Sequence, residues 1–300
     1  MREVRFLGPL LALALAAASL RAQGPSLPPI NTPPTNQSLQ GKIVWADLHT
    51  SDPEAAIRFY TALFGWTANT LRRHGRAYTI LSSGGQPVAG VAERPAAARD
   101  QGRGRWIVYL SVADVPRTVA VALANGGRVV FPPKELPARG TQAMLADDQG
   151  GLFGILHSSS GDPEDYEPEV GDWAWAHVFA KDSADGMRFY QAVFGYSVTP
   201  DTARNRPDVY LLSSQGLARG ALGPLPNRPD AMPGWLAFVR VASVDRTVGR
   251  VASLGGRVLV DPKSTQPGSR IAILADPVDG AVGVMEMSDP AAVQNQGAQP

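Results

Sequence analysis

Hydrophobic and polar positions alternate along residues 43–50 (IVWADLHT), the pattern of a β-strand with one buried face. Asp52 and Pro53 follow, and these residue types favour the N-cap and the first position of a helix. Apolar side chains then recur at helical spacing, and Gly65 is suited to end that helix in the left-handed conformation. Shorter strands are predicted after it, among them residues 77–82 and 88–93.

The same order of elements returns further along the chain. Residues 106–112 alternate again, Asp114 is the expected helix cap, and residues 115–124 form the next predicted helix. Gly126 and Gly127 are its expected stop. The strands predicted after this helix include residues 142–146 and 152–157. The chain therefore contains a unit of one strand, one helix and three strands, used more than once.

The pattern of the first half of the sequence recurs in the second half. Residues 43–66 resemble residues 173–196, and the dipeptide Phe59-Tyr60 recurs as Phe189-Tyr190, 130 positions later. Matched blocks at nearly constant offset indicate a tandem duplication. We expect two homologous domains at residues 41–158 and 171–288, joined by an acidic, proline-containing linker at 159–170.

The predicted fold class is α+β. Each domain would consist of two βαβββ units that form one cupped mixed sheet. Because each strand has an apolar and a more polar face, the helices should cover only the outer face of the sheet. The other face would then line a cup.

The N-terminal region carries a targeting pattern. Arg2 and Arg5 precede an apolar run at residues 7–18, which is too short to cross a bilayer of about 30 Å. Small residues follow, so residues 1–22 are predicted to be a signal peptide, with a buried first helix as the alternative. The chain would then be exported to the periplasm or the extracellular space, with no membrane contact after cleavage. Residues 23–40 read as a proline-rich linker and residues 289–300 as a disordered tail.

Charge and cysteine content exclude several classes of function. The chain has 28 Lys+Arg and 27 Asp+Glu, a balance that argues against a nucleic-acid partner. It has no cysteine, which excludes disulfides, cysteine-based metal sites and cysteine nucleophiles. Four histidines remain as candidate ligands or bases.

Two motifs carry a family resemblance. The start D-L-H-T-S-D at 47–52 and the block F-Y-T-A-L-F-G-W at 59–66, within the fourfold unit, resemble the vicinal oxygen chelate superfamily. This is the glyoxalase/bleomycin-resistance/extradiol-dioxygenase group, and the likeness to its tandem glyoxalase-like subgroup covers residues 41–288. The group includes isomerases, ring-cleaving dioxygenases, epoxide-opening transferases and antibiotic-sequestering proteins. The resemblance therefore specifies the fold more closely than the activity.

The resemblance also implies where a divalent metal would be bound. The first ligand position falls on Trp45 and Trp175. The other positions fall near Ile107, Leu236, Ile155 and Val284. None of these side chains can donate an oxygen or an imidazole nitrogen. We therefore expect no metal at the family position, and no cofactor. Each tryptophan would either stack on a flat ligand or fill the space of the metal.

A displaced polar set lies two positions further along the predicted strands. It pairs Asp47 with His157 in the first domain and His177 with Glu286 in the second. Each pair could act as a general acid and base. In the first domain, Asp47 and His157 could also bind a metal in a shifted site, with His49 or Glu93 as the third ligand. The alternative is that they are hydrated residues at the ends of strands.

Other side chains are expected to face the cups. The predicted ligand-binding residues are Trp45, Asp47, Tyr109, Trp175, His177, Phe238 and Arg240, with Ser111 beside them. Arg240 could bind a carboxylate or phosphate, or pair internally with Glu286. Tyr78 is expected to serve in packing, and Arg139 to lie near a rim with a minor role in attracting an anionic ligand.

Together these features predict an exported glyoxalase-like protein, a monomer or homodimer, that binds a small organic molecule in aromatic cups without the family metal. Catalysis is left open, as is the question of whether both domains are active. One alternative is a metal-dependent lyase, isomerase or dioxygenase that uses the displaced Asp/His set, with a divalent metal as its cofactor. Another is a structural or assembly module without catalysis.

Overall fold

A computed structural model describes residues 27–73, 76–94, 104–202, 206–228, 231–266 and 269–287. The predicted signal peptide, the C-terminal tail and His74 lie outside these residues. Within the described ranges, no helix is long and apolar enough to span a membrane.

The chain forms four βαβββ units in sequence. The strands are β1 Ile43–Thr50, β2 Thr67–Arg73, β3 Arg76–Ser83, β4 Gln86–Glu93, β5 Arg105–Ser111, β6 Arg128–Leu136, β7 Gly140–Ala146, β8 Leu152–Ser158, β9 Trp173–Ala180, β10 Ser197–Asp201, β11 Arg206–Ser214, β12 Leu217–Pro224, β13 Gly234–Arg240, β14 Arg257–Gln266, β15 Ser269–Ala275 and β16 Ala281–Glu286. The helices are α1 Pro53–Phe64, α2 Val115–Ala124, α3 Ser183–Phe194, α4 Val244–Val251 and the short 3-10 helix η3 Ala252–Leu254.

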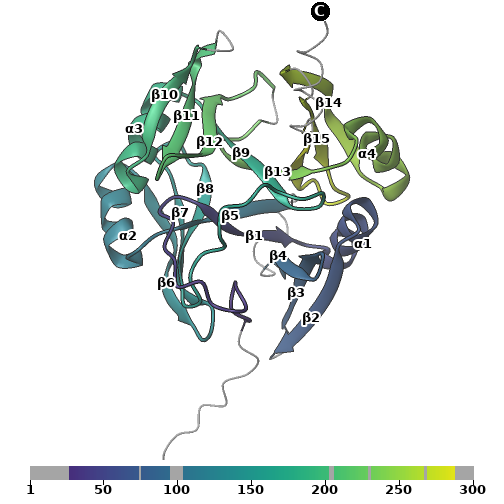
Figure 1. The fold of residues 1–300 in the computed structure, drawn as a ribbon, viewed down its shortest axis with the longest axis horizontal. Coiled ribbons are helices and arrows are strands. Elements are labelled where there is room, and N and C mark those ends of the chain that lie inside the picture. Colours follow the sequence, from purple (N-terminus) through teal and green to yellow (C-terminus); the bar gives the residue numbers. More distant parts are fainter. Residues whose placement is uncertain are drawn as a thin grey trace, which may run out of the picture.

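The units join into one mixed sheet of 16 strands (Figure 1). In each unit the first strand pairs with the last in parallel, as β1 does with β4, and the remaining strands follow antiparallel. Within each domain the first strands of the two units pair antiparallel, β1 with β5 and β9 with β13. This confirms the predicted fold class, a cupped mixed sheet of βαβββ units.

The helix boundaries follow the capping residues in the sequence. Asp52 Oδ1 accepts a hydrogen bond from Ala55 N at 2.9 Å, and Gly65 ends α1 with a φ of 74°. The repeat reproduces both features, because Asp182 caps α3 and Gly195 ends it with a φ of 68°. Local sequence chemistry thus sets where each of these helices begins and ends.

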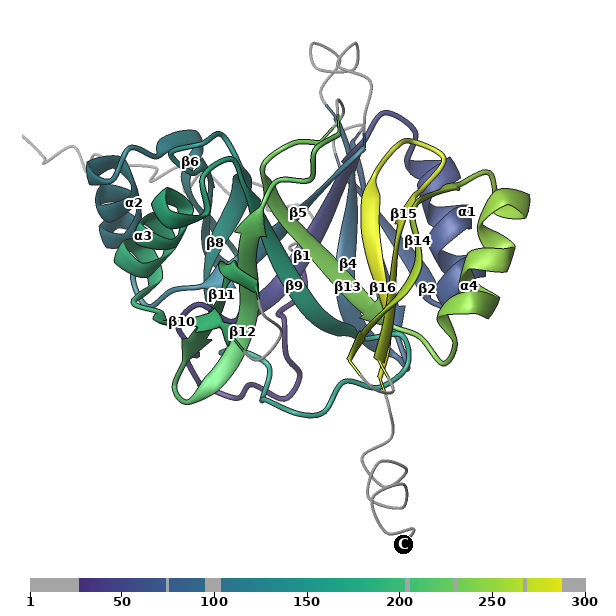
Figure 2. The same ribbon diagram turned by 90° about the horizontal axis from the view of Figure 1, so that it is seen from above.

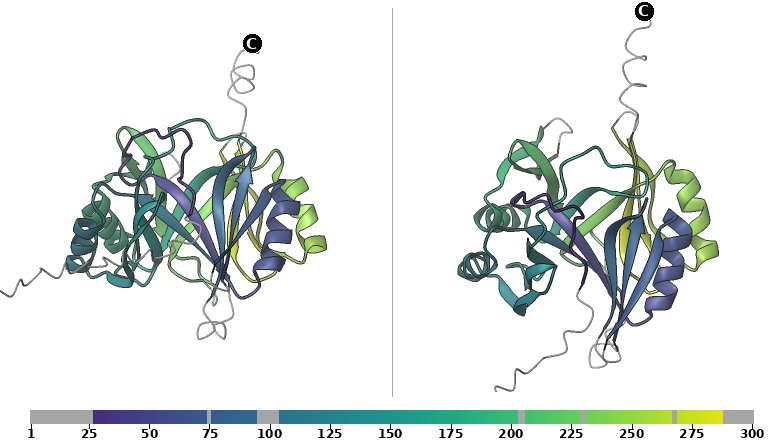
Figure 3. Two further views of the ribbon diagram at one scale, coloured as in Figure 1. Left: turned by 90° about the horizontal axis from the view of Figure 1, so that it is seen from below. Right: turned by 60° about the horizontal axis from the view of Figure 1, so that its bottom comes forward.

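The two domains share two large hydrophobic cores. Helix α1 packs against α4 and α2 against α3, so each helix pair joins the first domain to the second (Figures 2 and 3). One core contains Phe153 of the first domain and Phe189 of the second, and the other contains Tyr60 and Val284. The outer face of each sheet is therefore covered partly by the other domain.

Two equivalent hydrogen-bond chains reinforce this packing. Trp106 Nε1 donates to the Tyr60 hydroxyl at 2.8 Å, which donates to Asp276 Oδ2 across the domain boundary at 2.9 Å. In the mirrored chain, Trp235 Nε1 donates to Tyr190 at 3.1 Å and Tyr190 to Asp147 at 2.9 Å. The repeated Phe-Tyr and Leu-Ala-Asp blocks of the sequence thus connect the domains.

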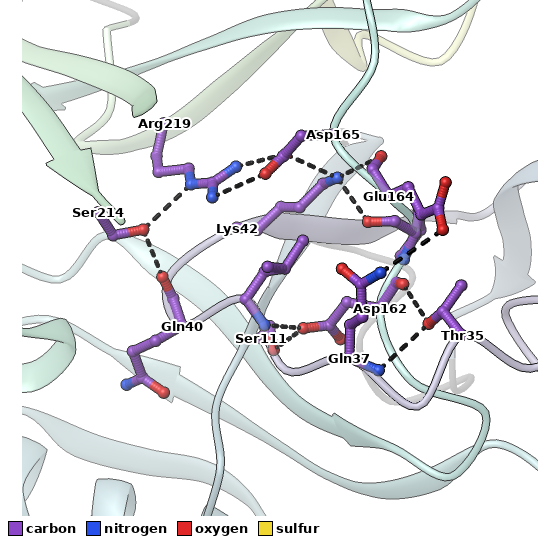
Figure 4. Close-up of polar contacts among 12 residues, drawn as sticks. Thr35, Gln37, Gln40, Lys42, Ser111, Asp162, Glu164, Asp165, Ser214 and Arg219 are labelled. Atoms are coloured by element: carbon purple, nitrogen blue, oxygen red, sulfur yellow. Dashed lines mark hydrogen bonds and ion pairs between the residues drawn. The ribbon is translucent and has the colours of Figure 1, made fainter. Parts of the chain in front are cut away.

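The predicted linkers are held against the fold (Figure 4). Asp162, 2% exposed, accepts from Leu39 N and Ser111 Oγ, each at 2.5 Å. Asp165 pairs with Lys42 at 2.9 Å and with both terminal nitrogens of Arg219, so the inter-domain segment binds both domains. Residues 27–40 run beside it, bonded to residues 160–162. Hydrogen bonds thus give these proline-containing segments a defined course.

Candidate ligand-binding cups

We call the concave face of the first domain, formed by β1–β8, cup 1. The concave face of the second domain, formed by β9–β16, is cup 2. Cup 2 contains a cavity of about 350 Å³. A neighbouring cavity of about 320 Å³ shares His177, Arg206 and Phe238 with it. The lining of the first cavity includes Trp175, His177, Val209, Leu211, Ala221, Phe238, Ile271 and Met285. A volume of this size suits a small organic molecule.

Strand alternation and register position the cup 2 side chains. Trp175, His177 and Phe179 occupy alternate positions of β9 and all three line these cavities. Phe238 of β13 lies directly opposite Trp175 in the antiparallel pair. The cavity therefore has two aromatic rings at its floor and an imidazole beside them.

His177 is held in its neutral form. Burial, and then the positive charges of Arg206 and Lys263, lower its pKa to about 4. Asp201 and Asp208 also line the two cavities, but the field at His177 is that of the two cations. Near neutral pH, cup 2 thus offers one hydrogen-bond donor and one acceptor from the imidazole in a positive field.

Cup 1 has the same positions filled by packed side chains. The strand pairing makes Trp45 and Tyr109 the counterparts of Trp175 and Phe238. In cup 1 these rings form a buried cluster with Ile30, which comes from the N-terminal segment. The other members are Val44, Ile80, Ile107, Met144 and Leu156. Trp45 is only 4% exposed, whereas Trp175 is half-buried.

Asp47 of cup 1 is held by aromatic donors. Its Oδ1 accepts from Trp45 Nε1 at 2.8 Å and from the Tyr78 hydroxyl at 2.7 Å. Burial, and then the Asp47 charge, raise the pKa of the Tyr78 and Tyr109 phenols. Gly90 faces this group, since a Cβ there would overlap the Tyr78 hydroxyl and the carboxylate. Tyr78 packs against the cup 1 cluster, as expected, and its hydroxyl also holds the Asp47 carboxylate.

Arg139 lies inside cup 1 rather than at a rim. It is 1% exposed, and its guanidinium carbon sits 4.1 Å from the centre of the Trp45 ring, in cation–π contact. Among the described residues, nothing accepts a hydrogen bond from its Nε or Nη2. The sequence showed an arginine here but gave no sign that it would be buried.

The expected pairs of acid and imidazole do not form. Strand β1 runs antiparallel to β5, whereas β8 runs parallel to β5, so a shift of two residues along β1 and β8 moves the side chains apart. Asp47 lies opposite Ile107, and the exposed His157 contacts the carbonyl of Val112 at the other end of β5.

The second domain separates its pair in the same way. His177 lies opposite Leu236 at the start of β13. Glu286 lies at the far end, where its Oε2 accepts from Val244 N at 2.9 Å and caps helix α4. Each of these side chains therefore has a separate role.

Arg240 also differs from the expectation. It donates to Glu167 Oε1 at 3.3 Å and to the Pro168 carbonyl at 2.5 Å, rather than to Glu286. Arg240 thus fastens the inter-domain segment, which removes it from the ligand cavity.

The donor set does not fit a divalent metal. In the described part of the chain, no three His, Asp or Glu side chains gather closely enough to hold an ion. Trp45 and Trp175 occupy the position expected for the first ligand, and an indole N–H offers no lone pair. The Nε2 of His49 is buried and has no partner among the residues that the structure describes, and burial lowers the pKa of His49, but His157 lies far along the sheet.

Comparisons with known proteins place both halves of the chain in one group. A sequence model described as "Glyoxalase/Bleomycin resistance protein/Dioxygenase superfamily" matches residues 42–155, and one described as "Glyoxalase-like domain" matches residues 175–285. The chain is 27% identical to "Putative glyoxylase CFP32" of Mycobacterium bovis, over 85% of this chain and 98% of that protein. It is 28% identical to "Anthracycline biosynthesis protein DauV" of Streptomyces sp., over 83% and 94%.

Solved structures show the same fold. The Mn(II)-bound glyoxalase from Novosphingobium aromaticivorans is 16% identical, with a TM-score of 0.57 over 84% of this chain and 85% of that one. Homoprotocatechuate 2,3-dioxygenase from Brevibacterium fuscum is 13% identical, with a TM-score of 0.59 over 87% and 86%. At such identities the likeness concerns the fold alone.

Proposed function

Because this chain belongs to the glyoxalase/bleomycin-resistance/dioxygenase superfamily, with a glyoxalase-like domain in each half, we propose that cup 2 binds a small, flat organic molecule without a metal ion. The observation that carries the proposal is the cavity of about 350 Å³ between Trp175, His177 and Phe238. Its counterpart positions in cup 1 are packed with side chains, so the two domains differ in accessible space. The ligand binds in one domain, and the other is structural in the intact chain.

The lining indicates the chemistry of the ligand. Two aromatic rings favour a flat, apolar body through stacking and dispersion contacts. Arg206 and Lys263 favour an anionic substituent, and the neutral imidazole of His177 can donate to it or accept from it. The relatives' names include a glyoxylase and anthracycline biosynthesis proteins, so the names do not select one chemistry. A flat aromatic carboxylate fits the lining.

The test uses 2-naphthoate as the probe and protein treated with EDTA. We expect saturable binding with one site per chain in isothermal titration, unchanged after addition of Mn²⁺, Zn²⁺ or Fe²⁺. Trp175→Ala should weaken binding at least tenfold, because a stacking contact of about 1 kcal/mol or more is lost together with buried area. The matched control Trp45→Ala, in cup 1, should lower stability and leave the naphthoate affinity unchanged.

Two results would overturn this function. Binding that requires a stoichiometric divalent ion would support the metal-dependent lyase or dioxygenase. Absence of binding for naphthoate and related aromatic acids, in a folded protein, would support the assembly module.

We also propose that the protein is exported, on the pattern of residues 1–22. The mature chain would start close to residue 23. N-terminal sequencing of protein from the periplasmic and culture fractions tests this, and recovery of an uncleaved chain from the cytoplasm would contradict it.

A further inference from the structure

The N-terminal segment, residues 27–40, occupies cup 1 in a way that no described segment of the chain reproduces in cup 2. Ile30 is 6% exposed and belongs to the cluster of Trp45 and Tyr109. The corresponding segment before the second domain, residues 159–170, leaves its large side chains outside: Tyr166 is 62% exposed and Val170 57%. Cup 1 is therefore filled partly by a segment that lies outside the sheet.

The segment joins no strand and is attached by hydrogen bonds to residues 160–162, among them Thr35 N to the Ser160 carbonyl at 2.9 Å, Leu39 N to Asp162 Oδ2 at 2.5 Å and Asp162 N to the Gln37 carbonyl at 2.9 Å. Asn31 and Thr35 donate to the carbonyls of Gly161 and Asp162, each at 2.6 Å. Ile30 is the one fully buried side chain between residues 27 and 40. Lifting this segment would break these contacts without removing a sheet hydrogen bond, so it can be released with the sheet intact.

The same cup holds a cation with unmet hydrogen-bonding capacity among the described residues. Arg139 is 1% exposed and stacks on Trp45, and within the described chain its Nε and Nη2 have no acceptor. Asp47, the carboxylate of cup 1, is instead bonded to ring donors. A buried guanidinium with two free N–H groups is suited to pair with a carboxylate through two parallel hydrogen bonds.

We propose that cup 1 is a second binding site, for a flat organic monoanion, and that residues 27–40 keep it closed. Arg139 would pair with the anionic group and Trp45 would support the ring. Ile30 occupies the space of the ligand's apolar part. The site is independent of the function proposed for cup 2, because no residue is shared between them.

The experiment compares the wild-type chain with Ile30→Asp, using 2-naphthoate and its neutral analogue 2-naphthamide. A charge at position 30 should expel the segment from the apolar cluster. We expect Ile30→Asp to bind one more equivalent of naphthoate than the wild type in isothermal titration. This additional site should prefer naphthoate to naphthamide at least tenfold, and Arg139→Gln in the same background should weaken it at least tenfold.

The matched control is Val170→Asp, which places the same charge on the exposed segment before the second domain. It should keep the wild-type stoichiometry. A folded Ile30→Asp protein with wild-type stoichiometry, equal affinity for the acid and the amide, or an additional site in Val170→Asp would each overturn the proposal.

A second variant guards against misfolding. A chain that begins at residue 37 removes Ile30, Asn31 and Thr35 without placing a charge in the cup. If both this chain and Ile30→Asp lose their circular dichroism spectrum, the segment is part of the core rather than a cover, which also overturns the proposal. If the wild type binds no naphthoate and Ile30→Asp binds one equivalent, the function proposed for cup 2 fails while this one stands.

Discussion

At the scale of single residues, equivalent positions of the two cups have diverged in chemistry. His177 occupies the position that Asp47 has in the first domain, and the two side chains have different surroundings. Asp47 is surrounded by donors from aromatic rings, whereas His177 faces a cavity and two cations. The duplication therefore gave one domain a packed polar centre and the other an open one.

The Asp47 carboxylate should matter for stability rather than for binding. Asp47→Ala leaves the buried Tyr78 hydroxyl without its acceptor and Trp45 Nε1 with only the Tyr78 oxygen at 3.1 Å, which we expect to destabilise the protein by about 1–3 kcal/mol. Urea unfolding measures this loss. Naphthoate affinity at cup 2 should be unchanged, and a loss of affinity equal to that of Trp175→Ala would contradict the separation of the two cups.

Two buried groups should give opposite dependences of stability on pH. The pKa of His177 is lowered to about 4, so below its ordinary value of 6.5 the unfolded chain binds more protons. The contribution of neutral His177 to the free energy of unfolding is therefore fully present above pH 6.5 and is lost as the pH falls to about 4. Burial raises the pKa of Asp276 to about 6, from 3.8, so its contribution falls as the pH rises across that window.

Single variants separate these contributions. Between pH 4.5 and 6, His177→Gln should remove a positive slope in the free energy of unfolding, and Asp276→Asn a negative one. Each slope corresponds to a difference of at most one bound proton between the unfolded and the folded state. Urea unfolding at several pH values measures both, and slopes of the same sign would show that one of the two environments is wrongly described.

At the scale of helices and strands, the sequence predicted boundaries well and neighbours poorly. Asp52, Gly65 and the alternation at residues 43–50 act locally, so their elements appear where expected. Whether Asp47 and His157 meet depends on the relative direction of β1, β5 and β8, which the alternation of side chains does not contain. The burial of Ile30 likewise depends on contacts far away in the chain.

The two hydrogen-bond chains that cross between the domains, Trp106–Tyr60–Asp276 and Trp235–Tyr190–Asp147, can be tested as a pair. Tyr60→Phe leaves Trp106 Nε1 without its acceptor and removes a donor from buried Asp276, and we expect a loss of about 1–3 kcal/mol. Tyr190→Phe should cost a similar amount. Because the two chains share no partner, the losses should add in the double variant, as urea unfolding can measure. Strong non-additivity would indicate that the two helix pairs are coupled.

At the scale of the whole molecule, the tandem domains behave as one body. The two larger hydrophobic cores take residues from each domain, and the linker is bonded to Lys42 and Arg219 on either side. Packing between the domains within one chain could supply the pairing that a single-domain protein would need a second copy to provide.

This organisation predicts a single unfolding transition. Neither domain can leave without exposing its half of both cores, so the calorimetric and van't Hoff enthalpies should agree. Scanning calorimetry measures both. Two resolved transitions, one for each domain, would contradict the shared cores.

The central claim, a metal-free cup in the second domain beside a closed cup in the first, is tested most directly by a crystal structure of EDTA-treated protein soaked in 2-naphthoate. The account predicts density for the ring between Trp175 and Phe238, with the carboxylate toward His177 and Arg206, and none beside Trp45. An empty second cup, or a metal ion coordinated within it, would contradict the account.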